Sequence, residues 1–332
     1  MKIAAVVVAY NRRDLLREAL DGIGHQTRKP DTVLVVDNAS TDDSAAVAGA
    51  HPAVSEVLRL TQNLGGAGGF AAGLARVLAS QSVDAVWLMD DDTAPTPTAL
   101  AELEKAWTGY PGRLAVASSR AVWTDGRIHP MNSQRTRLFA SRDERWRARQ
   151  VGARPIRTGS FVSMLVGADA ARAKGLPVAD YFIWNDDLEY SARLVRPVRR
   201  RRVGQGVDQP GWRGIAVPSS VVVHKTQEFA SGLSNPGPRF YFEVRNKLWA
   251  LVKSGSFGPL DAAAYGAYTL ANWLRLVMRS PDSGQRRDLL TAARKGIRDG
   301  LLSKPTANAY IFAGQGRIAE QVAAVETGAS QR

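Results

Sequence analysis

The first part of the chain, about 120 residues, alternates short and almost continuously apolar runs with segments of helical periodicity. Such apolar runs are typical of strands covered on both faces, and the segments between them repeat apolar residues at the three-to-four-residue spacing of a helix. We predict strands at residues 3–9, 32–36, 54–60 and 85–89. We predict helices at residues 43–50, 68–79 and 98–107, and a first helix capped by Asp14. This order predicts an α/β fold with a mostly parallel sheet flanked by helices.

The chain changes character after this part. Residues 125–157 contain nine arginines without clear periodicity, so we expect an excursion from the sheet. Strand patterns return at residues 159–168 and 215–224, and the pattern is helical from residue 240 to about residue 325. The later segments therefore predict a completed sheet followed by a C-terminal helical extension.

We place a domain boundary at Pro236-Gly237-Pro238, which divides the chain into residues 1–235 and residues 236–332.

The N-terminal apolar run is too short for a secretory signal and suits a strand. The best candidate for a membrane span, residues 260–278, contains Asp261, Asn272 and Arg275. We therefore expect a protein that is soluble or lies on a membrane surface without crossing it.

The amino-acid composition excludes several kinds of functional site. The 332 residues include no cysteine, which excludes disulfides, thiolate metal sites and cysteine nucleophiles. The net charge of +13 is uneven: residues 1–100 hold 8 Lys and Arg against 12 Asp and Glu, and the remaining residues hold 36 against 19. A basic C-terminal part suits a polyanion or an anionic bilayer, and a plain solvated surface is the alternative.

Polar and glycine-rich segments follow the predicted strands, where an α/β sheet binds its ligands. Asp90, Asp91 and Asp92 form the most acidic of them. Three neighbouring carboxylates repel one another, and Asp90 and Asp92 project the same way from an extended segment, so they could share a divalent cation. A solvated acidic turn is the alternative. His224, at the end of another predicted strand, could complete a Mn²⁺ or Mg²⁺ site.

A glycine-rich segment, Asn63-Leu64-Gly65-Gly66-Ala67-Gly68-Gly69, precedes a predicted helix. Glycines let backbone amides approach an anion at the helix N-terminus, so the segment suits a nucleotide phosphate. It also contains a loose dinucleotide fingerprint, although that fingerprint normally belongs to the first strand–helix turn. Packing of the glycines against neighbouring elements is the remaining alternative.

A second acidic cluster, Asp186, Asp187 and Glu189, follows Trp184 at the start of a helical pattern. Carboxylates that are crowded and partly desolvated have raised pKa values, which suits a general base near neutrality. Helix capping is the alternative. Farther on, Arg245 shares a helix face with aromatic residues and could pair with a phosphate, whereas an outward-facing arginine on an amphipathic helix is the alternative.

The ordered set of these motifs resembles the inverting family-2 glycosyltransferases with the GT-A fold. The segments NLGGAGGF, MDDD, FIWNDDLEYSARL and RFYFEVRN look most like actinobacterial galactofuranosyltransferases of the galactan-initiating type. Rhamnosyltransferases that use dTDP-rhamnose share most of the motifs, so they are the alternative. The resemblance implies a metal-dependent nucleotide-sugar enzyme that transfers galactofuranose from UDP-galactofuranose with inversion.

The resemblance also assigns roles to residues. Asp187 would be the catalytic base, and Asp90, Asp92 and His224 would hold Mn²⁺ or Mg²⁺. The nucleotide-sugar site would comprise Ala9, Tyr10, Arg12, Asp37, Asn63, Gly65, Gly66, Asp90 and Asp91. The acceptor site would comprise Trp184, Asp186, Tyr241 and Arg245. No motif transfers to the arginine-rich segment.

The implied acceptor is a saccharide linked to a polyprenyl diphosphate, used in cell-wall or surface polysaccharide synthesis. Basic and tryptophan-bearing helices after residue 247 would then hold the enzyme to the inner face of the cell membrane from the cytoplasm. A plain helical subdomain or a homo-oligomer contact is the alternative use of these helices.

Two other classes of protein fit less of the sequence. A nucleotidyltransferase would share the nucleotide-binding half but needs no acidic base after Trp184. A nucleic-acid binder would explain the basic charge and the arginines at residues 199–202, but gives no reason for acidic clusters at strand ends. We therefore expect no nucleic-acid partner.

Overall fold

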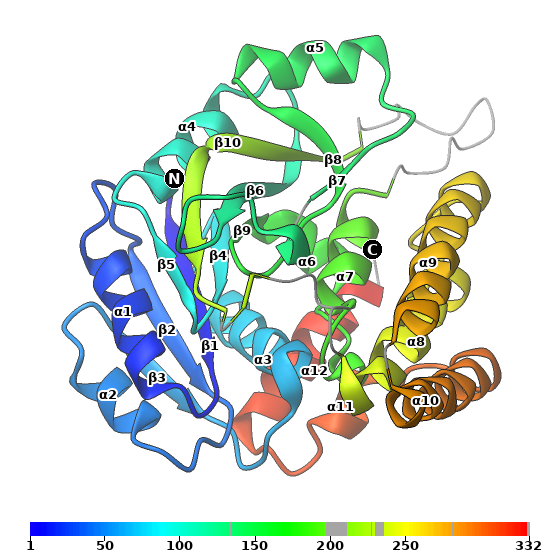
Figure 1. Ribbon diagram of the computed structural model, residues 1–332. Coiled ribbons are helices and arrows are strands. Elements are labelled where there is room, and N and C mark those ends of the chain that lie inside the picture. Colours follow the sequence, from blue (N-terminus) through cyan, green and yellow to red (C-terminus); the bar gives the residue numbers. More distant parts are fainter. Residues whose placement is uncertain are drawn as a thin grey trace.

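The architecture comes from a computed structural model. It describes residues 1–80, 82–132, 134–196, 211–226, 228–229, 236–280 and 282–330. Its centre is a mixed sheet with strand order β3-β2-β1-β4-β9-β6-β10-β8-β7, and β5 pairs with β10 (Figure 1). The strands are β1 (Ile3–Ala9), β2 (Thr32–Asp37), β3 (Glu56–Arg59), β4 (Ala85–Asp90), β5 (Thr93–Pro95), β6 (Leu114–Val122), β7 (Arg135–Thr136), β8 (Arg154–Thr158), β9 (Met164–Gly167) and β10 (Arg213–His224).

The N-terminal half of the sheet is parallel, as the sequence predicts. β1 lies between β2 and β4 and is parallel to both, and β3 extends the same ladder beyond β2. β9 then runs antiparallel between β4 and β6, while β6 and β10 are parallel. Because β1, β2 and β4 point the same way, their carboxyl ends meet at one edge of the sheet.

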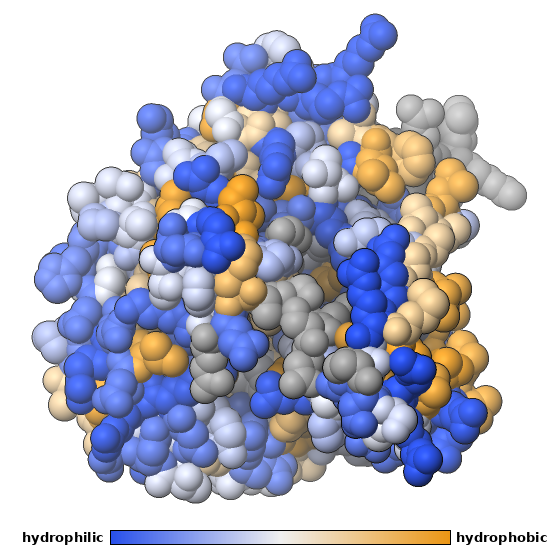
Figure 2. Space-filling model, in the orientation of Figure 1, coloured by the Kyte–Doolittle hydropathy of each residue, from blue (hydrophilic) through white to orange (hydrophobic). Residues whose placement is uncertain are grey.

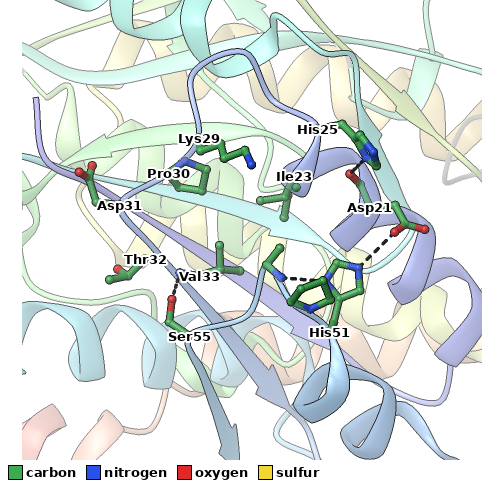
Figure 3. Close-up of a pocket in the computed structure, with 13 residues that line it drawn as sticks. Asp21, Ile23, His25, Lys29, Pro30, Asp31, Thr32, Val33, His51 and Ser55 are labelled. Atoms are coloured by element: carbon green, nitrogen blue, oxygen red, sulfur yellow. Dashed lines mark hydrogen bonds and ion pairs between the residues drawn. The ribbon is translucent and has the colours of Figure 1, made fainter.

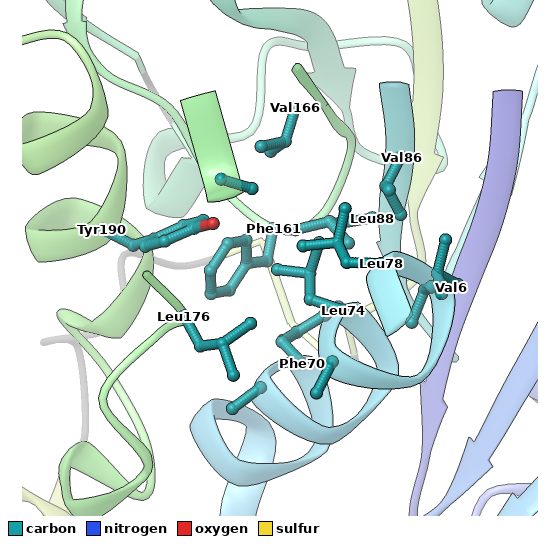
Figure 4. Close-up of a cluster of buried hydrophobic side chains, with 14 of the residues drawn as sticks. Val6, Phe70, Leu74, Leu78, Val86, Leu88, Phe161, Val166, Leu176 and Tyr190 are labelled. Carbon is teal, nitrogen blue, oxygen red and sulfur yellow. The ribbon is translucent and has the colours of Figure 1, made fainter. Parts of the chain in front are cut away.

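Helices cover both faces of this sheet. They are α1 (Arg13–Gly24), α2 (Ser44–Ala50), α3 (Gly65–Ser80), α4 (Ala99–Gly109), α5 (Arg142–Gln150), α6 (Ala168–Lys174) and α7 (Asp186–Leu194). All seven residues of β1 are buried, and they alternate between two clusters. One face packs on α3, where Val6, Leu74 and Phe161 meet (Figure 4). The other face packs on α1 and α4.

The last hundred residues are mostly helical. They form α8 (Phe240–Leu248), a π-helical turn (Trp249–Lys253), α9 (Pro259–Arg279), α10 (Ser283–Leu302), α11 (Asn308–Ile311) and α12 (Arg317–Ser330). α10 packs on α8 at one side of the molecule, whereas α12 returns to α3 and α6 (Figure 1). Ile318, Val322 and Val325 of α12 join the apolar cluster beneath the sheet. The domain boundary at residue 236 stays a prediction. Helix α12, which follows it, packs into the apolar cluster that α3 forms with β1.

The structure corrects three details. Asp14 lies inside the first turn of α1 instead of capping it, because the helix already begins at Arg13. The helix expected at residues 68–79 already begins at Gly65, so all the glycines that follow Asn63 belong to α3. The strand expected at residues 159–168 is limited to β9, and the arginine-rich segment returns to the sheet as β7 and β8.

Candidate active site

An acidic turn follows β4 and carries the first predicted cluster. Asp91 is anchored by the backbone N–H of Tyr10, which donates to its Oδ2 at 2.9 Å. Arg12 reaches the same turn, with its Nη1 atom 3.2 Å from Asp91 Oδ1 and 2.6 Å from Asp92 Oδ2. Burial raises the pKa of Asp91 to about 6, although Arg12 opposes the shift. The segment after β1 thus holds the acidic turn in place, while the Tyr10 side chain is exposed.

Asp90, Asp92 and His224 converge, as predicted, although they come from β4, the following turn and β10. One potential ligand atom from each lies within 4.8 Å of the others. Burial, then the neighbouring carboxylates, raise the pKa of Asp90 well above its usual value. Asp92 is also buried, but its contact with His224 and the charge of Arg12 lower its pKa. Such a group of two carboxylates and an imidazole suits a divalent cation.

The orientation of His224 also fits a metal site. Its Nδ1 atom lies 2.7 Å from Asn132 Oδ1, which can only accept a hydrogen bond, so Nδ1 carries the proton. In the neutral imidazole, Nε2 then keeps its lone pair and is free to bind a metal, and it lies 3.1 Å from Asp92 Oδ1. That oxygen is buried and has no well-aligned donor among the described residues. Asn132 was not found from the sequence, because no motif marks a residue that acts through a histidine.

The carboxyl end of β2 carries the predicted Asp37. Its side chain is buried, accepts a hydrogen bond from the Ser40 N–H at 3.2 Å, and lies 3.3 Å from Arg59 Nε. Ala9 is buried at the end of neighbouring β1 and pairs with Asp37 in the ladder. The structure therefore brings these two predicted nucleotide-binding residues to one edge.

Asn38 organises the glycine-rich segment and was not predicted. Its Nδ2 donates to Asn63 Oδ1 and to the Gly65 carbonyl, and its Oδ1 accepts from the Leu64 N–H. Asn63 in turn accepts from the Gly65 N–H at 2.8 Å. These bonds place Asn63, Gly65 and Gly66 at the start of α3, beside the end of β2.

Glycine is required in this segment for two different reasons. Gly65 has a φ of +70°, and a Cβ atom there would lie 2.0 Å from the Phe182 carbonyl oxygen. A Cβ at Gly69 would lie 2.4 Å from Val8 Cγ1, so that glycine lets α3 approach β1. Gly66 has open space beside it. Packing thus explains Gly69, while Gly66 remains available to a ligand.

The segment before α7 is held in a rare backbone conformation. Phe182, Trp184 and Asn185 all have positive φ values, between 61° and 67°. Non-glycine residues adopt this region at an energetic cost, so the surrounding structure must hold them there. Asn246 of α8 does so: its Nδ2 lies 2.8–2.9 Å from the carbonyl oxygens of Tyr181, Ile183 and Trp184.

Asp186 and Asp187 begin α7 and have different surroundings. Asp187 Oδ1 accepts from the Leu188 N–H at 2.6 Å, and Ser160 and the Phe161 N–H also donate to this carboxylate. Burial nevertheless raises its pKa. Asp186 lies close enough to Asp90 for its negative charge to raise the pKa of that carboxyl group. Burial and the charge of Asp187 raise the pKa of Asp186 to about 8.

α8 supports this cluster from outside the sheet. Glu243 accepts a hydrogen bond from Asn185 Nδ2 at 2.7 Å and lies 3.6 Å from Lys247 Nζ. Lys247 is buried and interacts electrostatically with Asp187. Neither Glu243 nor Lys247 was predicted, because an acid and a lysine one helical turn apart are common on any solvated helix.

Two predicted acceptor residues on α8 are engaged by the chain itself. Arg245 is buried, donates to the Asp180 carbonyl at 2.6 Å, and stacks over Trp249 at 4.1 Å. The Tyr241 hydroxyl donates to Asp299 of α10 at 2.9 Å. The other two predicted acceptor residues, Trp184 and Asp186, lie where the segment held by Asn246 leads into α7. Contact of these four residues with an acceptor stays a prediction.

The cavity drawn in Figure 3 lies away from this site. It has a volume of about 390 Å³ and lies at the amino ends of the strands, between Ile23, Thr32 and His51. His51 contacts Asp21 Oδ1 through Nε2 at 3.2 Å, and its Nδ1 accepts from the Ala53 N–H. The lining of this cavity includes none of the predicted site residues. The basic run at residues 199–202 falls outside the described part of the chain.

Comparison with known families decides the class of protein. Residues 4–172, just over half of the chain, match the family described as Glycosyl transferase family 2. The chain belongs to glycosyl transferase family 2. This confirms the family expected from the motifs, and the match covers β1 to α6, including Asp37, the glycine-rich segment and Asp90–Asp92. Asp187 and His224 lie beyond the matched residues.

Curated relatives come from mycobacteria. The chain is 33% identical over 210 residues to galactofuranosyltransferase GlfT1 of Mycolicibacterium smegmatis, covering 58% of this chain and 65% of that protein. It is 36% identical over 209 residues to galactofuranosyltransferase GlfT1 of Mycobacterium tuberculosis, covering 58% and 64%. The matched part thus spans a little under two thirds of each relative.

Solved structures support the fold. A fragment of Staphylococcus aureus TarS in complex with UDP aligns with a TM-score of 0.58 at 12% identity, covering 99% of this chain and 88% of that one. The mannosyltransferase PcManGT from Pyrobaculum calidifontis, in complex with GDP-mannose and Mn²⁺, aligns with a TM-score of 0.53 at 17% identity, covering 99% and 86%. The expected mixed, mostly parallel α/β fold with C-terminal helices is confirmed.

Proposed function

We propose that this protein is an inverting galactofuranosyltransferase that transfers galactofuranose from UDP-galactofuranose to a saccharide on a polyprenyl diphosphate. The observation that carries the proposal is the proximity of two acidic clusters: the charge of Asp186 at the start of α7 acts on Asp90 at the end of β4, and Asp92 meets His224 there. A donor site and a base are thus built side by side, which a single-displacement transfer requires.

The donor nucleotide would occupy the carboxyl edge of β1, β2 and β4. Asp37 and Asn63 would contact the nucleoside, and the open space beside Gly66 at the N-terminus of α3 suits a phosphate. Asp90, Asp92 and His224 would hold Mn²⁺ or Mg²⁺, which stabilises the negative charge that develops on the leaving diphosphate. The mannosyltransferase PcManGT was solved with GDP-mannose and Mn²⁺, which supports a metal in this fold.

Asp187 would accept the proton of the attacking acceptor hydroxyl. Hydrogen bonds from Ser160, Phe161 and Leu188 fix its carboxylate, so the group keeps one orientation while the acceptor changes. The acceptor oxygen then attacks the anomeric carbon from the side opposite the diphosphate, which inverts the configuration. Trp184, held in its positive-φ conformation, would support the acceptor sugar.

The sugar donor is inferred from the relatives. Both mycobacterial proteins carry the name galactofuranosyltransferase, which favours UDP-galactofuranose over the dTDP-rhamnose alternative. A lipid-linked acceptor is supported by α9, where Leu270, Leu274 and Met278 form an exposed stripe beside Arg275 and Arg279. The same side of the molecule is lined by hydrophobic residues in Figure 2. None of the described helices is long and apolar enough to span a bilayer.

A donor panel tests the proposal. We expect UDP-galactofuranose with Mn²⁺ to raise the melting temperature more than dTDP-rhamnose or GDP-mannose does, because a ligand that binds only the folded state stabilises it. Transfer to a synthetic polyprenyl-diphosphate saccharide should then require UDP-galactofuranose. Turnover of dTDP-rhamnose without turnover of UDP-galactofuranose would replace the galactofuranosyl assignment with the rhamnosyl one.

A further inference from the structure

Arg135 belongs to the arginine-rich segment, which carries no recognised motif. It forms β7, and its backbone is paired with Thr158 of β8. The residues that follow Thr158 include Ser160 and Phe161, which donate hydrogen bonds to the Asp187 carboxylate. Arg135 is therefore one strand away from the segment that anchors the proposed base.

Lys247 approaches the same place from α8. Its ammonium group is buried, lies 3.6 Å from Glu243 Oε1, and interacts electrostatically with both Asp187 and Arg135. Burial and the repulsion from Arg135 lower its pKa, while Glu243 and Asp187 oppose the shift. The charges of Arg135 and Lys247 therefore act on each other, and that of Lys247 also acts on Asp187. Glu243 and Asp187 offset this repulsion at Lys247, so the uncompensated positive charge of the pair is that of Arg135.

The guanidinium of Arg135 is held by aromatic rings. It lies 5.5 Å from the centre of the Tyr265 ring and 4.9 Å from that of Tyr268, both on α9. Tyr265 also contacts β7 through its hydroxyl, which donates to the Thr136 carbonyl at 3.4 Å. A guanidinium stacked on rings keeps N–H groups at its edge for bidentate bonding to a phosphate.

Arg157 of neighbouring β8 differs from Arg135, because all its contacts are with the chain itself. It is buried, pairs with Asp261 at 3.2 Å, and donates to the carbonyls of Ala192 and Ser256. Arg135 is only partly buried, and within the described part of the chain its charge has no carboxylate partner at ion-pair distance. Its surroundings therefore leave it able to bind an external anion.

We propose that Arg135 and Lys247 form an anion subsite that binds a phosphate group of the acceptor beside Asp187, with Tyr265 and Tyr268 orienting the guanidinium. The proposal rests on the proposed function, which supplies a diphosphate-linked acceptor. The subsite would hold the acceptor by its charged linkage while the sugar hydroxyl meets Asp187. The diphosphate of the donor is the other source of the same chemistry, and the experiment separates the two.

The test compares two acceptors that carry the same saccharide, one with a diphosphate linkage and one without. One is a saccharide on a short polyprenyl diphosphate, and the other is the same saccharide on a neutral octyl chain. We expect Arg135→Gln to raise the KM of the diphosphate acceptor about tenfold or more, as expected for a lost hydrogen bond to a charged group. The KM of the neutral acceptor and the Kd of UDP should stay within about twofold. Arg135→Lys, which keeps the charge, should recover part of the loss.

Arg149→Gln is the matched control, since Arg149 is an exposed arginine of the same segment on α5. It should leave all three constants unchanged. Equal losses with both acceptors would overturn the subsite and make Arg135 a link between β7 and α9. A weakened Kd for UDP would instead assign the cations to the donor, which also overturns the proposal. Failure of wild-type protein to use either acceptor would refute the proposed function itself.

Discussion

At the scale of single residues, the site depends on carboxylates whose surroundings differ sharply. Asp187 accepts hydrogen bonds from Leu188, Ser160 and Phe161, whereas the charge of Asp186 acts on Asp90. Neighbouring side chains at a helix start point about 100° apart, so these two acids cannot perform the same task. Their surroundings thus separate a carboxylate fixed by hydrogen bonds from one that interacts with the acidic turn.

The roles of these acids can be distinguished by paired substitutions. We expect Asp187→Asn to lower kcat about 100-fold or more, because a positioned general base typically contributes that much. Binding of UDP-galactofuranose and Mn²⁺ should stay within a few-fold, measured by calorimetry. Asp186→Asn should lower transfer less. If Asp186→Asn is the inactive variant and Asp187→Asn is active, Asp186 is the base.

A second prediction at this scale concerns Asn132, which orients His224. We expect Asn132→Ala to weaken Mn²⁺ binding about 10-fold or more, because partners that orient a ligating histidine contribute on that scale. Asn132→Asp keeps an accepting oxygen opposite His224 Nδ1 and should bind Mn²⁺ much better than the alanine variant. Metal titration followed by electron paramagnetic resonance measures both. Equal affinity in Asn132→Ala and wild type would show that His224 is not a ligand.

At the scale of elements, α3 connects the core to the donor site. Its glycines allow close contact with β1: a Cβ at Gly69 would lie 2.4 Å from Val8 and one at Gly73 2.5 Å from Val6. The N-terminus of the same helix contacts the Phe182 carbonyl through the Ala67 N–H at 3.3 Å. α3 therefore sets the position of the glycine-rich segment and of the strained turn before α7 together.

Two glycine substitutions test this packing. We expect Gly69→Ala to lower the free energy of unfolding by about 1–3 kcal/mol, because an added methyl overpacks a filled interface. Gly49→Ala on α2 is the control, since nothing lies within 4 Å of its added Cβ. It should be stabilising by up to about 1 kcal/mol, since alanine favours a helix interior over glycine. Urea unfolding measures both, and a neutral Gly69→Ala would mean that α3 can shift away from β1.

At the scale of the whole molecule, the C-terminal helices divide between two surroundings. α12 buries Val322 and Val325 in the apolar cluster between α3 and the sheet, whereas α9 leaves Leu274 and Met278 more than half exposed, at 53% and 68%. Because exposed apolar residues at this spacing lie on one helix face, the stripe is suited to a lipid surface. The basic charge of the C-terminal part would add attraction to anionic headgroups.

Vesicle binding tests this surface. We expect the protein to bind anionic vesicles more tightly than neutral ones, and high salt should release much of it, since each surface Lys or Arg contributes about 1 kcal/mol. The double variant Leu274→Ser, Met278→Ser should bind more weakly in co-sedimentation. Tyr310→Ser removes an exposed aromatic side chain of α11 and should bind as wild type does. Equal binding to neutral and anionic vesicles would contradict the electrostatic contribution.

The sequence by itself determined the parallel half of the sheet and the residues at its carboxyl edge. Continuous apolar runs and helical spacing are local properties, so β1, β2 and β4 and the chemistry of Asp37, Asp90 and Asp92 could be predicted from short windows. The ordered motifs were also enough to indicate the family. The glycine-rich segment was located correctly, but its helical state was not, because glycine has low intrinsic helix propensity and only packing on β1 explains it there.

Only the tertiary structure decided which distant residues support these motifs. Asn132 acts on His224, Asn38 on the glycine-rich segment, and Asn246 on the turn before α7. An asparagine that binds backbone carbonyls leaves no periodic signal, and its partners are fixed by chain crossings that no local pattern encodes. The same reason applies to Arg135: it lies one strand away from the segment that anchors Asp187 because β7 pairs with β8, and that pairing is a property of the folded sheet.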